Sequence, residues 1–305
     1  MKKILIILSC LFCSSWAFAQ QQEHYSMYMM NYYLVNPAEG GTDDYVDLKL
    51  GYRTQWVGLE GAPKTGTLAI HSPVGKRVGL GVSLINDEIG PVRETNAYAD
   101  FSYTLPMGAD NKLAFGVKAG ATFHKIGISE VDIDVIDAGD PFFAENIDAV
   151  TPNVGAGVYF YKPNKYYVSV SVPNILNATH LDASGTKIGS ETQHLFAAVG
   201  YVFDLSENFK LKPHALLKTA FTAPLSFDVN ANLFMYDFVE LGVGYRLEDS
   251  FSGMVNFKVA PNLRVGYAYD SIQSDLNYAT SSSHEVFINF DISFPKRVSR
   301  SPRYF

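Results

Sequence analysis

The sequence predicts an all-β protein that crosses a membrane as a closed transmembrane antiparallel β-barrel of about 14 strands. Three observations predict it: apolar residues alternate with small or polar ones, the alternating segments are long, and their connections are short and long in turn. Composition agrees, because 47% of the 305 residues are hydrophobic and 14% are aromatic, while only 18% are charged. No stretch after the first residues reaches the ~18 apolar residues of a membrane-spanning helix.

Residues 1–19 are typical of a secretory signal peptide. Two lysines precede an apolar run, and the small-residue site A-F-A at positions 17–19 follows it. We therefore expect cleavage after about Ala19. The only two cysteines, Cys10 and Cys13, lie in this piece, so the mature chain would hold no thiol for a disulfide or a metal site. Lipoprotein processing at Cys10 is an alternative, but it would leave a short apolar core.

The period-2 pattern recurs along residues 45–294, the predicted barrel. In residues 112–124, for example, the odd positions are apolar and the even positions are polar or small. Successive side chains of a strand point to opposite faces, so each such segment has one apolar face. Most segments have about 9–13 residues, which suits a tilted membrane strand of ~9–11. The predicted strands are near residues 45–57, 64–73, 77–86, 93–105, 111–125, 152–162, 165–172, 192–204, 208–218, 224–235, 238–247, 250–260, 262–271 and 284–294.

The connections sort by length onto two rims. The even-numbered ones are all short, whereas the three longest, near residues 126–151, 173–191 and 271–283, are odd-numbered. Membrane barrels have short periplasmic turns and longer outer loops. With a periplasmic N-terminus, the long loops face outward. Residues 295–305 would form a periplasmic tail, basic in character, that either docks on another protein or is a solvated end.

Residues 20–44 precede the first strand and lack its alternation. They are rich in Tyr, Met and Asn and end in turn-like N-P-A and G-G sequences. A barrel of this size encloses more space than an eight-strand barrel, and we expect this segment to plug the lumen. The alternative is a disordered periplasmic tail. The candidate plug residues are Tyr25, Tyr28, Met29, Asn31, Asn36 and Pro37.

Neither catalytic nor cofactor motifs stand out. The seven histidines are scattered, and a nucleophile elbow, a phosphate loop and a dinucleotide fingerprint are missing. We therefore expect no enzyme activity, no cofactor and no metal site, although an enzyme built on distant residues stays open. The net charge of −7 argues against nucleic acid. One loop carries five clustered carboxylates. It either binds calcium or is a solvated acidic edge; its acidic residues are Glu130, Asp132, Asp134, Asp137 and Asp140.

The run RTQWVGLEGAPKT at residues 53–65 joins the first two predicted strands. Alternation places Arg53 and Gln55 on the lumenal face and Trp56 on the lipid face, where aromatic belts lie. A glycine- and proline-shaped turn with an anchoring tryptophan explains the uncharged residues of the run. It does not explain Arg53, Glu60 and Lys64, which we expect to pair near the rim or with the plug. The candidate partner or rim residues are Arg53, Gln55, Trp56, Gly58, Glu60, Gly61, Pro63 and Lys64.

With this run the chain resembles the PorP/SprF family, outer-membrane proteins of the Bacteroidetes type IX secretion and gliding system. The opening YSMYMMN through NPAEGG, the run above, VGLGVSLINDEIGP at 78–91, VPNILN at 172–177 and the ending SPRYF all fit. Met30 and Glu39 stand where the family usually has Phe and a small or aromatic residue. The resemblance covers essentially the whole mature chain.

The resemblance implies a partner rather than a substrate. It implies a role in the export, attachment or surface display of a secreted adhesin that carries a C-terminal type IX secretion domain. We expect the barrel to bind and display the adhesin through that domain, with the three long loops making contact. Periplasmic type IX or gliding components and outer-membrane lipid would be further partners. A small-solute channel or a FadL-like transporter with an N-terminal hatch is the alternative.

Overall fold

The structure is a computed structural model, and it describes residues 25–127, 146–176, 179–183, 186–190, 193–220 and 225–293. Predictions for the signal peptide, the acidic loop at 130–140 and the C-terminal tail lie outside these residues. Among the described residues, no helix is long and apolar enough to cross a membrane.

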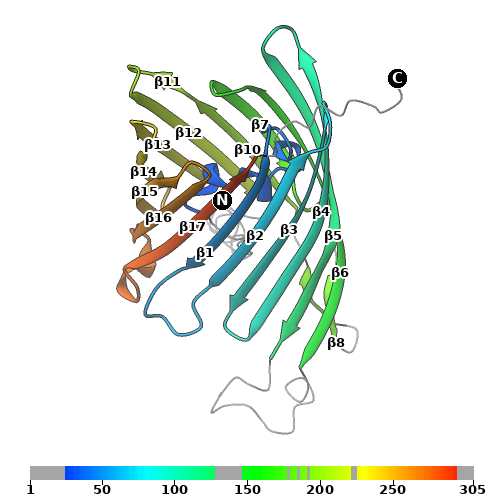
Figure 1. The fold of residues 1–305 in the computed structure, drawn as a ribbon. Helices are drawn as coiled ribbons and strands as arrows, with labels where there is room; N and C mark the ends of the chain where they lie inside the picture. Colours follow the sequence, from blue (N-terminus) through cyan, green and yellow to red (C-terminus); the bar gives the residue numbers. More distant parts are fainter. Residues whose placement is uncertain are drawn as a thin grey trace, which may run out of the picture.

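The chain folds into a closed antiparallel barrel, which confirms the predicted fold class (Figure 1). One sheet runs from β10 to β12, and the pairing of β10 with β12 closes it. The two-residue β11 pairs only with β12 and continues β10, so fourteen strand positions surround the lumen. The barrel strands are β1 (Val46–Thr54), β2 (Lys64–Pro73), β3 (Val78–Ile89), β4 (Val92–Met107), β5 (Asn111–Ile126), β6 (Ile147–Lys162), β7 (Tyr166–Val172), β10 (His194–Tyr201), β11 (Phe203–Asp204), β12 (Phe209–Ala220), β13 (Ser226–Met235), β14 (Val239–Arg246), β15 (Ser250–Ala260), β16 (Leu263–Ile272) and β17 (Ser282–Ile292).

Burial is inverted relative to a soluble protein, as expected of a barrel in lipid. Along β5 the polar or small residues Lys118, Thr122 and His124 are buried, while Val117 and Phe123 are exposed on the outer face. The same alternation holds around the wall, so leucine, valine and phenylalanine side chains cover the outside. The fold thus has an apolar exterior that suits hydrocarbon and a polar interior.

The two rims differ as the connection lengths predict. The short-turn rim carries residues 74–77, 108–110, 163–165, 205–208, 236–238 and 261–262. The strand ends that flank the connections 55–63, 90–91, 127–146, 173–193, 221–225, 247–249 and 273–281 lie at the opposite, long-loop rim. β4, β5 and β6 have 16 residues each, against nine in β1, and in Figure 1 β5 and β6 extend farthest at the long-loop rim.

Three details differ from the predicted strands. β1 ends at Thr54 because the backbone enters a left-handed turn at Trp56 (φ 47°). β6 begins at Ile147, five residues before the predicted start. The long connection after β7 contains a hairpin of its own, β8 (Thr179–Ala183) with β9 (Thr186–Ser190).

The N-terminal segment, residues 25–45, lies inside the barrel (blue in Figure 1). It folds as three short 3-10 turns, η1 (Tyr28–Met30), η2 (Tyr32–Leu34) and η3 (Pro37–Glu39), and then enters β1 at the short-turn rim. A last 3-10 turn, η6 (Asp275–Tyr278), lies in the β16–β17 connection. The fold therefore places an irregular segment in the lumen, where its own turns satisfy part of its backbone and wall side chains satisfy further groups.

Candidate functional site

The wall of the lumen carries many buried charges. A charge taken out of water is costly unless it is paired and hydrogen-bonded, so each inward charge must find a partner on the wall or on the N-terminal segment. The buried charged residues are Asp47, Lys49, Arg53, Asp87, Asp100, Lys118, Lys218, Asp228, Glu240, Arg246, Asp270 and Glu285.

The Arg53 cluster, made of Ser26, Arg53, Gln55, Asp270 and Glu285, joins the segment to the wall near the long-loop rim. The Arg53 guanidinium lies 2.7 Å from Asp270 Oδ2 and 3.2 Å from Glu285 Oε2. It also donates to Ser26 Oγ at 2.9 Å and to Gln55 Oε1 at 3.2 Å. Three wall residues, Arg53 of β1, Asp270 of β16 and Glu285 of β17, thus converge on one serine.

The Arg53 cluster is complete only with the segment in place. One guanidinium faces two carboxylates, so hydrogen-bond donors must compensate the second negative charge. Ser26 N–H donates to Glu285 at 2.7 Å, Met27 N–H donates to it at 3.2 Å, and Ser26 Oγ–H donates to Asp270 at 2.6 Å. Withdrawing the segment would leave buried acceptors unsatisfied, which costs ~1–3 kcal/mol each and more for charged groups.

A second arginine, Arg246, contacts Tyr25 at the start of the segment. Arg246, at the end of β14, pairs with Asp228 at 2.9 Å and with Asp249 at 3.0 Å. Its remaining nitrogen donates to Tyr25 O at 3.4 Å. Arg246 and Arg53 therefore both fix the start of the segment at the same end of the lumen.

Farther along, wall side chains satisfy the carbonyls of η2. Lys118 Nζ donates to Leu34 O at 3.0 Å, and Ser171 Oγ donates to Val35 O at 2.9 Å. The hydroxyl of fully buried Tyr33 donates to Asp100. These bonds replace the partners that a regular helix would have supplied.

Asn36 begins η3 and ties it to the opposite wall. Its Oδ1 accepts from Ala38 N at 2.9 Å as an N-cap, and its Nδ2 donates to Ser169 Oγ at 2.6 Å and Val158 O at 3.1 Å. The backbone comes so close here that a Cβ on Gly116 would overlap Ala38, and one on Gly157 would overlap the Asn36 side chain. Glycine at these two inward positions makes room for the segment.

Glu39, the last residue of η3, lies beside a cation on the wall. Its carboxylate lies 3.8 Å from Lys49 Nζ, which is also 3.0 Å from Asp47. It also lies 3.8 Å from His71 Nε2. Burial raises the pKa of Glu39 to about 7; Lys49 opposes this shift, and Asp43 and Asp47 add to it.

The residues predicted to plug the lumen all lie in this segment and contact the wall. Tyr28, Asn31, Asn36 and Pro37 are buried, and Tyr25 and Met29 are half-buried. Tyr28, Tyr32 and Val35 pack with Phe196, Ala198 and Leu216 of the wall in one apolar cluster. Met27 and Tyr33 belong to the Tyr- and Met-rich segment predicted as the plug and are among its most buried residues. Ser26 was not singled out by the sequence.

The structure separates the residues of the predicted rim run. Arg53 and Gln55 point into the lumen, as predicted, and pair there. Trp56 is half-buried in a turn beyond β1, so strand alternation does not place it on the lipid face. Glu60 and Lys64 are exposed and distinct from the Arg53 cluster.

The remaining residues of that run form a turn that is hydrogen-bonded to β17. Gly58 and Gly61 have φ of 97° and 72°, which glycine adopts without strain. Gln55 N–H donates to the carbonyl of buried Pro63 at 2.9 Å, closing the turn. Trp56 N–H donates to Ser283 Oγ at 3.1 Å, and Val57 N–H donates to Ser282 O at 2.9 Å, so the turn is fixed to β17.

Within the described ranges, no group of three or more His, Cys, Asp or Glu side chains is arranged to hold a metal ion. The described carboxylates of the lumen interact with arginine, lysine and segment atoms or, as Asp87 does with Thr65, with polar side chains of the wall. The acidic loop that left calcium open lies outside the described residues.

A model of one protein family matches nearly the whole chain. It is described as type IX secretion system membrane protein PorP/SprF, and it matches residues 17–290. The chain belongs to the PorP/SprF family. Family and barrel together place this PorP/SprF protein in the outer membrane, as a type IX secretion system barrel. A comparison with curated proteins finds no match.

Solved structures share the barrel with this PorP/SprF protein. A monoaromatic hydrocarbon channel, CymD, is similar at 14% identity and a TM-score of 0.53, covering 91% of this chain and 95% of its own. The Ralstonia pickettii toluene transporter TbuX gives 11% identity and 0.53, covering 86% and 93%. A Pseudomonas aeruginosa FadL homologue gives 11% and 0.52, covering 85% and 93%. At these identities the likeness concerns the fold alone.

Proposed function

We propose that this PorP/SprF barrel binds and displays a secreted adhesin at the cell surface, through the adhesin's C-terminal type IX secretion domain. The observation that supports the proposal is the N-terminal segment inside the barrel, hydrogen-bonded to Arg53, Lys118 and Arg246 of the wall. With its lumen occupied by this segment, the barrel has its rims and their loops left as binding surfaces. Binding residues are often found on loops over a rigid scaffold. Catalysis has no part in this function.

The long-loop rim is the surface we assign to the adhesin. Its connections at 127–146 and 173–193 are the two longest between barrel strands, followed by 55–63 and 273–281 with nine residues each, and outer loops of membrane barrels are the longer ones. In this orientation the short-turn rim faces the periplasm, where type IX or gliding components would bind. A leader cleaved after about Ala19 brings the chain there.

The proposal also gives the N-terminal segment a role as a plug. Two arginines at one end of the lumen and Asn36 and Glu39 toward the other hold it along its length. A small-solute channel would require this segment to leave as a hatch. Breaking the buried charge contacts of the Arg53 cluster opposes that movement.

A pull-down from native cell envelopes tests the proposal. The tagged barrel is extracted in mild detergent, and co-purifying proteins are quantified by mass spectrometry. We expect one large secreted protein with a C-terminal type IX secretion domain in roughly equal amount. A variant with residues 273–281 replaced by a short Gly-Ser linker should lose it, whereas one with altered 236–238 should keep it.

Recovery of the barrel without any secreted protein would contradict stable binding. Conductance of the pure protein would then support the channel alternative.

A further inference from the structure

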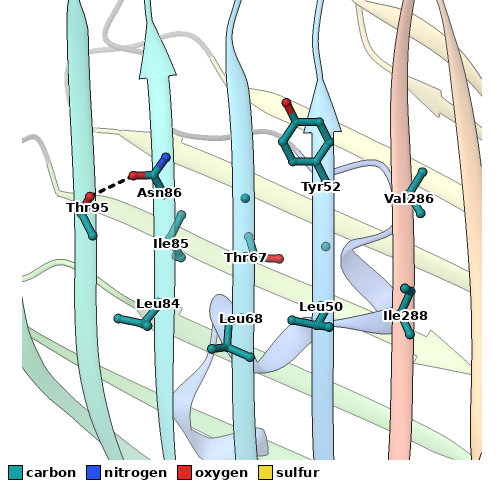
Figure 2. A pocket seen from close by; sticks show the side chains of 12 residues that line it. Leu50, Tyr52, Thr67, Leu68, Leu84, Ile85, Asn86, Thr95, Val286 and Ile288 are labelled. Atoms are coloured by element: carbon teal, nitrogen blue, oxygen red, sulfur yellow. Dashed lines mark hydrogen bonds between the residues drawn. The ribbon is translucent and has the colours of Figure 1, made fainter.

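The outer wall carries a groove where hydrocarbon is expected. The Gly66 groove, with a volume of about 420 Å³, lies over β1, β2 and β3, with Leu50, Tyr52, Leu68, Leu84 and Asn86 among its lining residues (Figure 2). Tyr52, Gly66 and Asn86 are directly paired neighbours across the three strands. The strand positions of Tyr52 and Asn86 are about 10 Å apart, since neighbouring strands are ~4.8 Å apart. The missing side chain at Gly66 leaves a gap wide enough for one acyl chain.

The fold does not require glycine at this position. A Cβ on Gly66 would meet nothing within 4 Å, and no positive φ is recorded there. Glycine weakens a strand interior and often marks a site where a ligand approaches closely. Gly66 therefore leaves a vacancy on the lipid face without helping the barrel to pack.

Polar groups lie on the wall beside this vacancy. Thr95 Oγ1 donates to Asn86 Oδ1 at 3.0 Å, an exposed hydrogen bond. This leaves the Asn86 amide protons and the Tyr52 hydroxyl, which donate to no residue in the described part of the chain. Unpaired donors are costly in hydrocarbon, and ester, amide and hydroxyl oxygens at the head of a lipid are suitable acceptors.

A charged row follows toward the long-loop rim. The next outward positions on five successive strands pair in register: Lys64, Glu88, Arg93, Lys125 and Asp148. The row lies about 7 Å beyond the groove, since each strand residue rises ~3.4 Å. The outward strand positions nearest the same rim on β12 to β16 are uncharged: Thr219, Phe227, Tyr245, Phe251 and Ser271.

Two cations of the charged row are direct neighbours. Arg93 and Lys125 are opposed across β4 and β5, and like charges directly opposite are destabilising. Arg93 lies 3.8 Å from Glu88, but both side chains are well exposed, and such a pair contributes little. Glu88 and Asp148 flank the Arg93–Lys125 pair in the row. The row keeps an excess of positive charge, which an anion over β4 and β5, beside the groove, would compensate.

We propose that the Gly66 groove and the charged row form a binding site for a phosphorylated glycolipid of the outer leaflet, of the lipid A type. One acyl chain lies in the groove over Gly66. The polar linkage of that chain accepts from Asn86 and Tyr52, and Arg93, Lys125 and Lys64 bind the phosphates. The site would bind the lipid on the side of the barrel that carries the longest strands, β4, β5 and β6.

Native mass spectrometry of the full-length barrel tests the site. The delipidated protein in detergent is titrated with bisphosphorylated lipid A, with the same lipid after removal of its phosphates, and with phosphatidylglycerol. We expect one lipid A per barrel and weaker binding of the other two. Lys125→Gln and Arg93→Gln should each weaken binding about fivefold, because a cation near a lipid surface contributes ~1 kcal/mol.

Two valine variants separate the groove from the general lipid shell. Gly66→Val fills the gap and should reduce lipid A binding at least tenfold while leaving the melting temperature unchanged or higher. Gly253 on β15 is the matched control, since it also points outward with nothing within 4 Å of a Cβ but has no charged row above it. Gly253→Val should bind lipid A like the wild type.

Equal losses in the two valine variants, binding that ignores the phosphates, or preference for phosphatidylglycerol would each overturn the proposal. Should Gly66→Val fold poorly, the exposed Lys125→Gln decides alone: unchanged affinity would contradict the site.

Discussion

Removing the Arg53 guanidinium should release the start of the N-terminal segment from the wall. Arg53 is 3% exposed and bridges Ser26 to two buried carboxylates, at 2.7 Å from Asp270 and 3.2 Å from Glu285. Arg53→Ala leaves both carboxylates without their cation, and breaking a buried pair in this way costs ~3–5 kcal/mol. Opening of the segment lets water reach both carboxylates and so relieves that cost. The population of the open state should therefore rise about 100-fold to 4,000-fold, at ~1.4 kcal/mol per tenfold.

A single reporter thiol measures this opening. The only native cysteines are Cys10 and Cys13, which lie outside the described residues. Met27 is 1% exposed and follows Ser26 directly, so Met27→Cys should react slowly with a bulky maleimide. In the Arg53→Ala background the labelling rate should rise by the factor above, and Arg53→Lys should be intermediate, because it keeps the charge and loses the fork.

The control for this experiment is Arg77→Ala. Arg77 lies near the short-turn rim, where its only described side-chain hydrogen bond is an exposed one to Tyr103 at 3.4 Å. Labelling in the Arg53→Ala background that stays within about threefold of the Arg77→Ala background would refute the reasoning that the Arg53 cluster holds the segment.

Three further changes act on the rest of the segment. The docked state holds the proton of Glu39, whose pKa is raised to about 7, so its contribution to stability should fall as pH rises from 4.5 to 7; the melting temperature of Glu39→Gln should lose that part of the pH dependence. Gly116→Val should overlap Ala38 and destabilise docking by ~1–3 kcal/mol, seen as faster thiol labelling at Met27, whereas Gly253→Val should not. Asn36→Ala removes a cap and two wall hydrogen bonds and should lower the free energy of unfolding by ~1–3 kcal/mol in denaturant titrations; no change would contradict its role.

The strands could be predicted because period 2 survives in every one of them. A lipid-facing wall forces apolar residues onto one face, so the same pattern correctly predicts that Lys118 and His124 point inward. The boundaries were less certain, since Trp56 leaves β1 by a left-handed turn that alternation does not encode. The β8–β9 hairpin was missed because it lies in a connection without a membrane face.

The contacts of the lumen could be predicted only in part. Alternation shows that Asp270 and Glu285 point inward, and an unpaired inward acid calls for a donor. Arg53 and Ser26 are both such donors. Ser26 is 244 residues from Asp270 and 259 from Glu285, so its pairing depends on how fourteen strands close. Lumenal glycines were a usable signal, since Gly116 and Gly157 do face the segment; Gly120 and Gly244 face strand neighbours instead.

Planar-bilayer recording of the purified full-length barrel tests most directly whether the lumen is closed. With the segment held by Arg53, Arg246 and Asn36, we expect no steady conductance in the wild type and openings in Arg53→Ala. A steady conductance of the wild-type barrel, equal to that of Arg53→Ala, would contradict it.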